Sequence, residues 1–372
     1  MTDAHAKFAP SSMYLTVACP GWHSQGPGLP ETETEESREG DAGHWVALFA
    51  RTVNVEEAYA LVGAPAPNMV EIDEDMVDGS RLWVEALEGY PARLEERLQI
   101  KSLHATDCWG TPDGRQWNPD TKTHRSADYK YGHGFVDEFE NWQNLSYTVG
   151  SLDQVYPTWR TDAAVTAEMT IVQPRYYRGN PIRTWTIQTA GLLHYEARMQ
   201  AAIREAEGPN PRVISGPHCK HCPKRVNCGT YHKAVMGIVD YVGVPDTAVR
   251  TPDEVGRELK LVQTMIKRLE ARETGLVAVA ESMIKAGTRV PNFKMEAAPG
   301  RLTWSEGVLE TVEMMANLAG KTIYNKPKPV TPTQAAERKL IDRHVRDLYA
   351  TRPNGAMKLV PDDPSKLARK LT

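Results

Sequence analysis

The triplet Asp128-Tyr129-Lys130 places an acid and a lysine two residues apart in a segment that alternates like a β-strand. Side chains two apart on a strand project from the same face, so Asp128 and Lys130 point together and the carbonyl of Tyr129 lies near that face. Carboxylate and carbonyl oxygens are the ligands that Mg²⁺ and Mn²⁺ prefer. A lysine beside such an ion can hold or deprotonate a water molecule, so the triplet favours metal-dependent attack on a phosphodiester.

Such a triplet is more often a solvated surface pair, worth under about 1 kcal/mol, so a catalytic interpretation needs a second acid. The segment that ends at Asp107 alternates like a strand, and the stretch 110–126 is rich in turn residues. Together they predict a hairpin that sets Asp107 beside Asp128. Asp113 and Asp120 are the alternative acids, although both lie in the predicted hairpin loop.

Two predicted helices supply further polar side chains. Gly40 and His44 have Gly-x-x-x-His spacing at the start of a helix, from which an imidazole can bind the same metal. Residues 136–155 are predicted to form a helix on which Gln143 and Tyr147 lie one turn apart. Two acids at the start of this segment are interpreted as solvated helix residues, not ligands; they are Glu138 and Glu140.

The ordered set of these motifs resembles the RecB-like branch of the PD-(D/E)XK nucleases, of the iron–sulfur type. The motifs are Gly40-x-x-x-His44, Asp107, Asp128-Tyr129-Lys130 and Gln143-x-x-x-Tyr147. The resemblance implies a restriction-endonuclease-like mixed sheet flanked by helices, with the metal bound by His44, Asp107 and Asp128. It also implies that Lys130 acts on the water and that Gln143 and Tyr147 sit near the lysine and the DNA. Phage- and prophage-encoded members, usually labelled as a domain of unknown function, are the most similar.

Three of the five cysteines follow the spacing C-x₂-C-x₅-C, at Cys219, Cys222 and Cys228. In a compartment where thiols stay reduced, this spacing indicates a metal site before disulfides. One ligand remains to be found. Cys19 would complete the Cys₄ set of a [4Fe–4S] cluster, which we favour, whereas His232 would complete a Cys₃His zinc site.

The iron–sulfur nucleases that this chain resembles carry one cysteine before the nuclease core and three after it. In them the cluster holds the two ends of the domain together. The resemblance therefore implies that Cys19 joins the three later cysteines around the cluster. Cys108, which adjoins Asp107, is interpreted as a buried structural cysteine.

Basic and aromatic residues near these motifs suggest a path for nucleic acid, because cations meet phosphates and rings stack on bases. With 44 basic and 48 acidic residues the net charge is −4, so such a surface must be a local patch. A solvated loop is the alternative for any one of these residues. The candidates are Arg175, Tyr176, Tyr177, Arg178 and Arg183, followed by Lys220, Lys224 and Arg225 in the cysteine segment.

The predicted elements form a mixed α/β core with a helical C-terminal extension. We expect a nuclease core with both cysteine motifs at 1–235 and a mainly helical extension at 236–372. A long amphipathic helix is predicted at 253–286, with Thr251 or Asp253 as its cap and Gly287 as its stop. Its apolar stripe of Leu259, Val262, Ile266 and Leu269 is predicted to pack on the core, and a last helix is expected at 333–349.

A metal-dependent DNA nuclease that uses Mg²⁺ or Mn²⁺ is the function we expect, as an exonuclease in phage DNA recombination, replication or processing. DNA is the expected partner, with a phage single-strand-binding or recombination protein as a second. The alternatives are a non-catalytic DNA-binding protein with a structural zinc or iron–sulfur site, and an assembly protein that uses the long helix. No run approaches the 18 apolar residues of a membrane span, and no signal peptide is evident. We therefore expect a cytoplasmic protein, in the bacterial host if it is phage-encoded.

Overall fold

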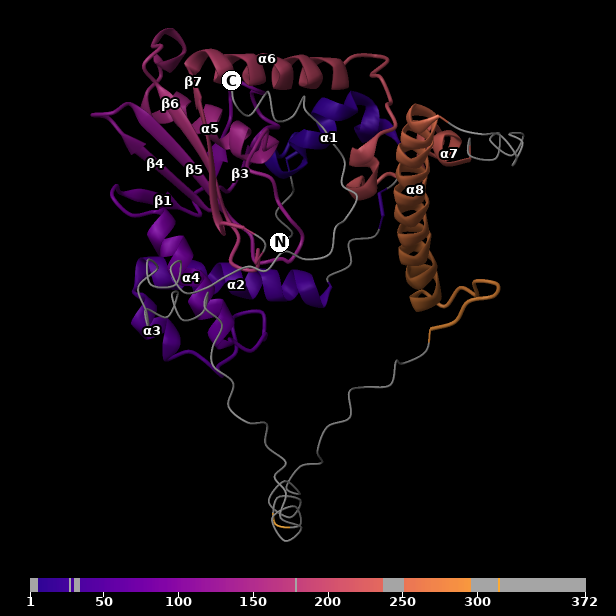
Figure 1. The fold of residues 1–372 in the computed structure, drawn as a ribbon, viewed down its shortest axis with the longest axis horizontal. Coiled ribbons are helices and arrows are strands. Elements are labelled where there is room, and N and C mark those ends of the chain that lie inside the picture. The colour runs from indigo at the N-terminus through magenta and orange to yellow at the C-terminus, as the bar shows by residue number, and fades with distance from the viewer. Residues whose placement is uncertain are drawn as a thin grey trace. The chain divides into compact units, whose positions relative to one another are not determined.

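A five-stranded mixed sheet is the centre of the fold (Figure 1). The computed structural model describes residues 6–26, 28–29, 34–177, 179–236, 251–295 and 314. The strands lie in the order β1 (Ala92–Leu94), β4 (Gly114–Asn118), β5 (Thr123–Tyr129), β6 (Thr166–Val172) and β7 (Ile182–Gln188). Only β5 and β6 pair in parallel; the other neighbours are antiparallel. A separate pair is formed by β2 (Leu98–Gln99) and β3 (Trp109–Gly110).

Helix α5 (Trp142–Val155) is the crossover that the parallel pairing of β5 and β6 requires. The side chain of Asn141 caps it by accepting a hydrogen bond from the main-chain N–H of Asn144. The helix therefore begins six residues later than the predicted start at 136. Asn144 also donates a 3.3 Å hydrogen bond to the carbonyl of Thr170 on β6, which fixes the helix over the sheet.

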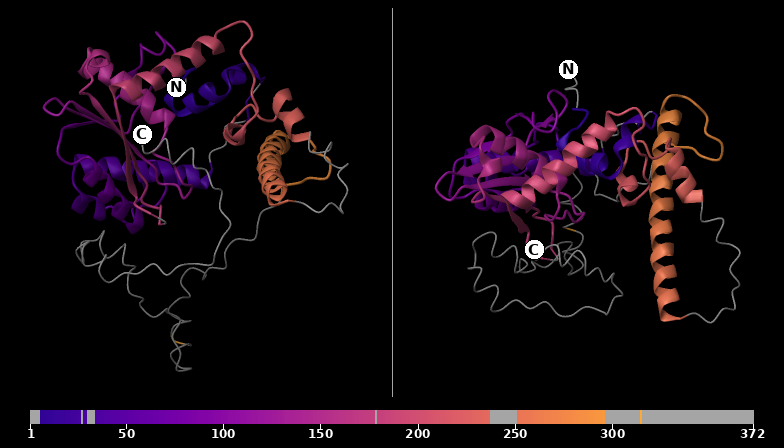
Figure 2. Two further views of the ribbon diagram at one scale, coloured as in Figure 1. Left: turned by 45° about the horizontal axis from the view of Figure 1, so that its top comes forward. Right: turned by 90° about the horizontal axis from the view of Figure 1, so that it is seen from above.

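Helices cover both faces of the sheet (Figures 1 and 2). Ala127 and Tyr129 of β5 pack into one core with α2 (Glu35–Thr52), α3 (Val55–Tyr59) and α4 (Glu74–Ala86). Met169 of β6 packs into the other core with α1 (Met13–Ala18), α5 and α6 (Thr189–Ala206). The predicted mixed α/β class is confirmed. Short 3₁₀ turns lie at Pro10–Ser12, Pro20–Ser24, Trp159–Thr161 and Pro217–His221.

Two helices follow the cysteine segment: α7 (Gly229–Met236) and α8 (Pro252–Lys285). Thr251 caps α8, since its Oγ1 accepts a 3.3 Å hydrogen bond from the N–H of Glu254, and Gly287 follows the helix with φ +82°. The chain divides into two compact units, Met1–Val279 with Leu359–Thr372, and Ala280–Lys358. The helix predicted at 333–349 lies outside the described residues.

The apolar stripe of α8 does not pack on the core, so that prediction was wrong. Leu259, Val262, Ile266 and Leu269 are 38%, 44%, 48% and 43% exposed. The helix contacts the cysteine segment through its opposite side, where the carbonyl of Ala271 accepts a 2.9 Å hydrogen bond from Arg225. Over the described residues, none of the helices is both long and apolar enough to cross a membrane.

Candidate metal and catalytic site

The ends of β4 and β5 bring two acids together. Asp113 stands one residue before β4, and Asp128 is the next-to-last residue of β5. The antiparallel pairing of Gly114 with Ala127 sets the two strand ends side by side. The main-chain N–H of Tyr129 then donates a 2.7 Å hydrogen bond to Oδ2 of Asp113. Both carboxylates are therefore fixed to the sheet where β4 begins and β5 ends.

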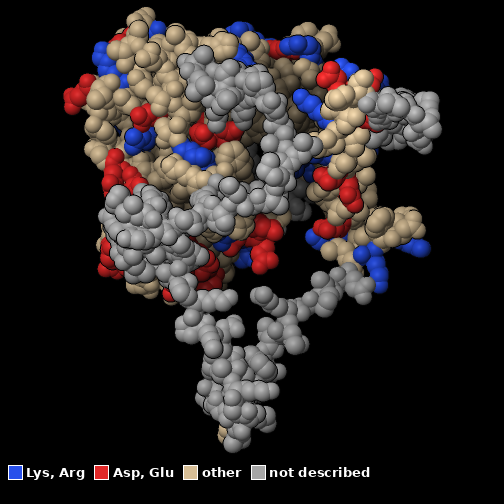
Figure 3. All heavy atoms as spheres, viewed as in Figure 1, with Lys and Arg blue, Asp and Glu red and all other residues tan. Residues whose placement is uncertain are grey.

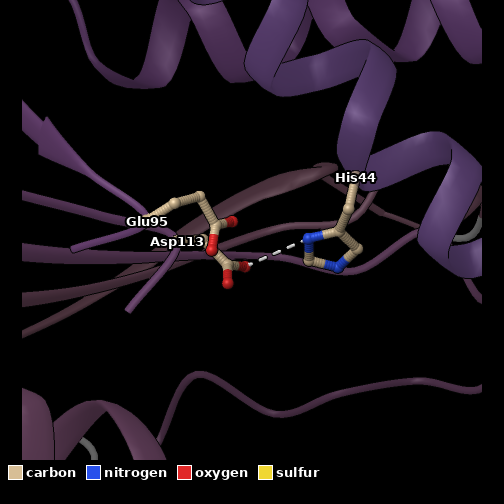
Figure 4. A group of neighbouring side chains, drawn as sticks. All are labelled: His44, Glu95 and Asp113. Atoms are coloured by element: carbon tan, nitrogen blue, oxygen red, sulfur yellow. Dashed lines mark ion pairs between the residues drawn. The ribbon is translucent and has the colours of Figure 1, made fainter. Parts of the chain in front are cut away.

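His44 reaches this edge from α2, on the Tyr129 face of the sheet. Its Nδ1 lies 3.6 Å from Oδ2 of Asp113, and its ring meets the ring of Tyr129 edge-on at 5.3 Å between centroids. Glu95, just beyond β1, joins them. One ligand atom each from His44, Glu95 and Asp113 lie within 4.8 Å of one another, with the three side chains directed inward (Figure 4). A nitrogen and two carboxylates at this spacing can share one divalent ion.

Asp128 is held by Lys130 and by α5. Its side chain is 3% exposed, and the Nζ of Lys130 lies 3.0 Å from Oδ1 and 2.9 Å from Oδ2. Gln143 donates a 3.0 Å hydrogen bond from Nε2 to the same Oδ1. Tyr147, one turn later, donates a 3.3 Å hydrogen bond to the carbonyl of Thr111. The two predicted side chains of α5 thus lie beside the acids. Gln143 orients Asp128, and Tyr147 anchors the chain before Asp113.

Two acids of the site, Asp113 and Glu95, hold protons more tightly than isolated carboxylates. Burial and then the charge of Asp128 raise the pKa of Asp113 to about 7, against the opposing effects of Lys130 and the Tyr129 N–H. Burial and then Asp113 raise the pKa of Glu95 to about 7 as well, although His44 opposes this. Crowded carboxylates disfavour full ionisation unless a cation offsets their repulsion. The site is therefore one that a divalent cation would stabilise.

The pKa values of the two basic groups of the site, His44 and Lys130, are shifted in opposite directions. Burial and then the charge of Lys130 lower the pKa of His44, so its imidazole is neutral near pH 7 and can bind a metal. Burial by itself lowers the pKa of Lys130, but Asp128 and Asp113 more than offset this and hold that pKa above its usual range. Lys130 therefore carries a proton while the acids carry their charge.

Asp107 is the residue that the structure does not bring to the site. It is exposed in the turn that precedes β3, where its N–H donates to Nδ1 of His104 and its carbonyl accepts from Phe8. The predicted strand before it is only the two-residue β2, in the separate small sheet. The hairpin partner of β5 is β4, so Asp113, the alternative acid, occupies the position expected of Asp107.

Other acids of the region have structural surroundings. Asp120 is exposed in the turn between β4 and β5. Glu138 pairs with Arg183 at 3.2 Å, and Glu140 accepts a 2.9 Å hydrogen bond from the hydroxyl of Tyr195, so neither is the solvated helix residue we expected. Glu95 was missed because it follows a three-residue strand that has no recognisable pattern. The ligand role of the Tyr129 carbonyl stays a prediction.

The four predicted cysteines converge although Cys19 is distant in sequence. Burial raises the pKa of Cys222 to about 11; the N–H of Lys224 opposes this, and the nearby Cys219, Cys19 and Cys228 add to it. All four are buried. Main-chain N–H groups point at three of the sulfurs: Ile214 at Cys19 (3.2 Å), Gly216 at Cys219 (3.4 Å) and Tyr231 at Cys228 (3.4 Å).

His232 and Cys108 have different surroundings from the four converging cysteines. His232 is exposed, whereas the four cysteines are buried, and its main-chain N–H donates a hydrogen bond to the carbonyl of Cys228. Cys108 is fully buried in the core beside α5, and burial raises the pKa of its thiol to about 12. It is the structural cysteine that was expected.

Most of the proposed DNA-contacting cations have protein partners. Arg175 forms two hydrogen bonds to Glu39, at 2.7 and 2.6 Å, and its side chain is 11% exposed. Lys224 donates to the carbonyl of Gly26, and Arg225 to those of Cys222 and Ala271. Lys220 is exposed, and Arg178 lies outside the described residues. On the face in Figure 3, acidic and basic side chains are interspersed. This face therefore carries no broad basic track among the described residues.

The whole architecture, from the first cysteine to the extension beyond α8, falls within one family match. The match covers residues 5–366, and it takes in both strand-end acids, His44 and all four converging cysteines. It spans well over half of the chain. The chain therefore belongs to the family described as Protein of unknown function (DUF2800).

Proposed function

We propose that the protein is a metal-dependent phosphodiesterase that cleaves DNA. The observation that carries the proposal is the meeting of His44, Asp113, Asp128 and Lys130 at the ends of two paired strands. A surface ion pair would need neither a neutral imidazole nor a second buried acid with a raised pKa. The resemblance of the sequence motifs to the RecB-like nucleases supports the same chemistry.

The metal would be held by His44, Asp113 and Asp128, with Glu95 as a further ligand. These residues offer one nitrogen and several oxygens, the donor set of Mn²⁺ and Mg²⁺. When bound, the ion would neutralise charge that develops on the phosphate and activate water. Gln143 keeps one oxygen of Asp128 fixed at 3.0 Å, so the acid does not need to reorder on binding.

Lys130 is proposed to position the attacking water and to manage its proton. In the metal-free protein its ammonium group is committed to both oxygens of Asp128. A cation among the acids would weaken this pairing and lower the pKa of Lys130, because the same carboxylates hold that pKa high. The lysine would then be free to accept a proton or to stabilise the phosphate charge.

The four cysteines are proposed to hold a [4Fe–4S] cluster, which would supply a covalent tie between the N-terminal segment and the segment after α6. The main-chain N–H groups directed at the sulfurs would help to stabilise its negative charge.

DNA degradation by anaerobically purified protein tests the catalytic proposal. Linear, nicked and single-stranded DNA are each incubated with Mg²⁺, Mn²⁺ or EDTA. Lys130→Met keeps the length of the side chain and removes its charge, and Lys122→Met is the matched control. Lys122 lies in the turn before β5, is 41% exposed and pairs with Asp162 at 2.6 Å. We expect the first substitution to reduce cleavage by about 10²-fold or more and the second to leave it unchanged.

The outcomes separate an enzyme from a binding protein. Metal-dependent cleavage that Lys130→Met removes supports the nuclease, and the substrate that disappears fastest gives its strand preference. If wild type and both variants bind DNA equally and none cleaves it with either metal, the catalytic proposal fails. The protein would then be a DNA-binding protein with a structural metal centre.

A further inference from the structure

Helix α8 carries an exposed apolar seam with the period of a coiled coil. From Val255 to Leu269 its apolar residues are separated by alternate steps of four and three, the spacing of positions a and d in a heptad repeat, and Leu276 follows seven residues later. Leu259 and Ile266 occupy a positions; Val255, Val262, Leu269 and Leu276 occupy d positions. Each is between 38% and 49% exposed. A surface helix that only covers its own domain would bury this stripe.

The opposite side of α8 is already occupied by the cysteine segment. Arg225 donates to the carbonyl of Ala271, and Tyr231 donates to the carbonyl of Arg268. A Cβ on Gly275 would come within 2.6 Å of the Val226 side chain, so the helix approaches this segment closely there. These contacts fall on heptad positions c and f, across the helix from a and d. The cysteine segment therefore supports α8 and leaves the seam facing away.

We propose that the seam binds α8 of a second copy of this chain in an antiparallel arrangement. The inference is independent of the proposed nuclease activity. With the two-fold axis at residue 264, Leu259 meets Leu269 of the second copy and Val262 meets its Ile266. The symmetry repeats both contacts, so four apolar layers form from one stripe. Antiparallel helices pair an a position with a d position in this way.

Charge selects this arrangement over a parallel one. In the antiparallel register Glu258 flanks Arg272 of the second copy, and the symmetry makes this attraction twice. A parallel pair in register would instead place Glu273, which stands at an a position, against its own copy inside the seam. In the antiparallel pair Glu273 meets Val255 at the end of the seam, where water can reach it. The side chain of Glu273 is exposed in the single chain, which suits that end position.

Sedimentation equilibrium of the full-length protein tests whether the seam associates. We expect wild type to form dimers at micromolar concentration, Ile266→Glu to weaken association by 100-fold or more, and Lys267→Glu to change it little. These two variants introduce the same residue at adjacent positions. Ile266 lies on the seam, and Lys267 lies beside it. Both positions are exposed, so neither variant should unfold the chain. A wild-type monomer at 50 μM, or a dimer that Ile266→Glu leaves intact, would overturn the proposal.

Charge reversal and cross-linking test the direction. Glu258→Arg and Arg272→Glu should each weaken the dimer by about two- to tenfold, and the double variant should restore it. Met265→Cys stands next to its own copy across the two-fold axis, so a short bis-maleimide should link it. Glu273→Cys faces its own copy only in a parallel pair, so it should not link. Wild type controls for the native cysteines. Linking through Glu273→Cys but not Met265→Cys would overturn the antiparallel arrangement.

Discussion

The main-chain N–H of Tyr129 donates a 2.7 Å hydrogen bond to Oδ2 of Asp113. This bond ties the acid before β4 to the end of β5, and it uses the residue between Asp128 and Lys130 to do so. The same Oδ2 lies 3.6 Å from Nδ1 of His44, so one carboxylate oxygen links the strand edge to α2. The positions of His44 and Asp128 relative to each other thus depend on Asp113.

Replacing Asp113 by Asn should abolish metal binding at this site, whereas Asp107→Asn should not. An amide at Asp113 removes the charge that would bind the cation, and it places an NH₂ or a carbonyl against the N–H of Tyr129. We expect Asp113→Asn to lower cleavage by at least about 10²-fold and to remove the increase in melting temperature that Mn²⁺ produces. Loss of activity in Asp107→Asn at an unchanged melting temperature would contradict the assignment.

Asp113 was the alternative, not the first choice, because β4 has the composition of a turn. The stretch around it contains Pro112, Gly114 and Pro119, which usually punctuate loops. Gly114 is there for packing, not for turning. A Cβ at this position would lie 2.9 Å from the ring of Trp83 on α4, so the strand needs a glycine to lie against the helix. That requirement comes from the tertiary structure and leaves no local signal.

Local patterns did predict the elements that carry their own signal. The alternation ending in Asp128 and the cap and stop of α8 needed only neighbouring residues. The approach of Cys19 to the three later cysteines came from a family resemblance, because no spacing links positions 200 residues apart. Glu95 had neither source. It follows a three-residue strand, and its φ of +49° is a property of the folded chain.

Metal binding at the site should strengthen steeply with pH. The pKa of Asp113 and that of Glu95 are both raised to about 7, so a divalent ion must displace protons below that pH. We expect apparent Mn²⁺ affinity to rise between pH 6 and 8 and to level off above. Titration calorimetry in two buffers of different ionisation enthalpy measures the protons released. If Mn²⁺ binding released no protons at pH 6.5, the raised pKa values would be contradicted.

The free energy of unfolding of the metal-free protein should fall as the pH rises, whereas the affinity for Mn²⁺ rises. A carboxyl whose folded pKa lies above its unfolded value contributes stability that is fully present below the unfolded pKa. That contribution is lost as the pH rises through the folded pKa. For Asp113 and Glu95 the loss falls between about pH 4 and pH 7. Melting curves of metal-free wild type and Asp113→Asn should therefore diverge across this window, with the variant less dependent on pH.

Two glycines of α2 should respond differently to alanine. A Cβ on Gly43 would lie 2.6 Å from the ring of Tyr131, which forces the helix away from the sheet and displaces the adjacent His44. Gly40 has nothing within 4 Å of that position. We expect Gly43→Ala to destabilise the fold by about 1–3 kcal/mol and to weaken Mn²⁺ binding. Gly40→Ala should stabilise it by up to about 1 kcal/mol. Urea unfolding measures both, and equal effects would argue against close packing at Gly43.

Iron content should depend on Cys19 but not on Cys108. Anaerobically purified wild type is expected to carry about four iron atoms per chain. Cys19→Ser removes one of the four converging thiols and should lower the iron content and the visible absorption. Cys108→Ser and His232→Ala should leave both unchanged, because Cys108 lies in the core beside α5 and His232 is exposed. Zinc in place of iron, retained in Cys108→Ser and lost in Cys19→Ser, would keep the ligand set and reject the cluster.

His124 should make the fold sensitive to acid. It is fully buried on β5, and within the described chain neither ring nitrogen has a hydrogen-bond partner. Burial, followed by the charge of Arg115, lowers its pKa to about 3. Because this value lies below the unfolded pKa of about 6.5, the unfolded chain takes up a proton that the folded chain refuses. The fold therefore loses stability as the pH falls from about 6.5 toward 3.

Removing the imidazole should remove that loss. The slope for one proton is at most about 1.4 kcal/mol per pH unit, so two units below pH 6.5 correspond to a change that urea unfolding can measure. We expect His124→Leu to flatten the dependence between pH 6.5 and 4.5, whatever its stability at pH 7. His194→Leu removes an exposed histidine and should keep the wild-type slope. Parallel curves for all three proteins would mean that the folded chain protonates His124 as readily as the unfolded chain does, which would contradict its lowered pKa.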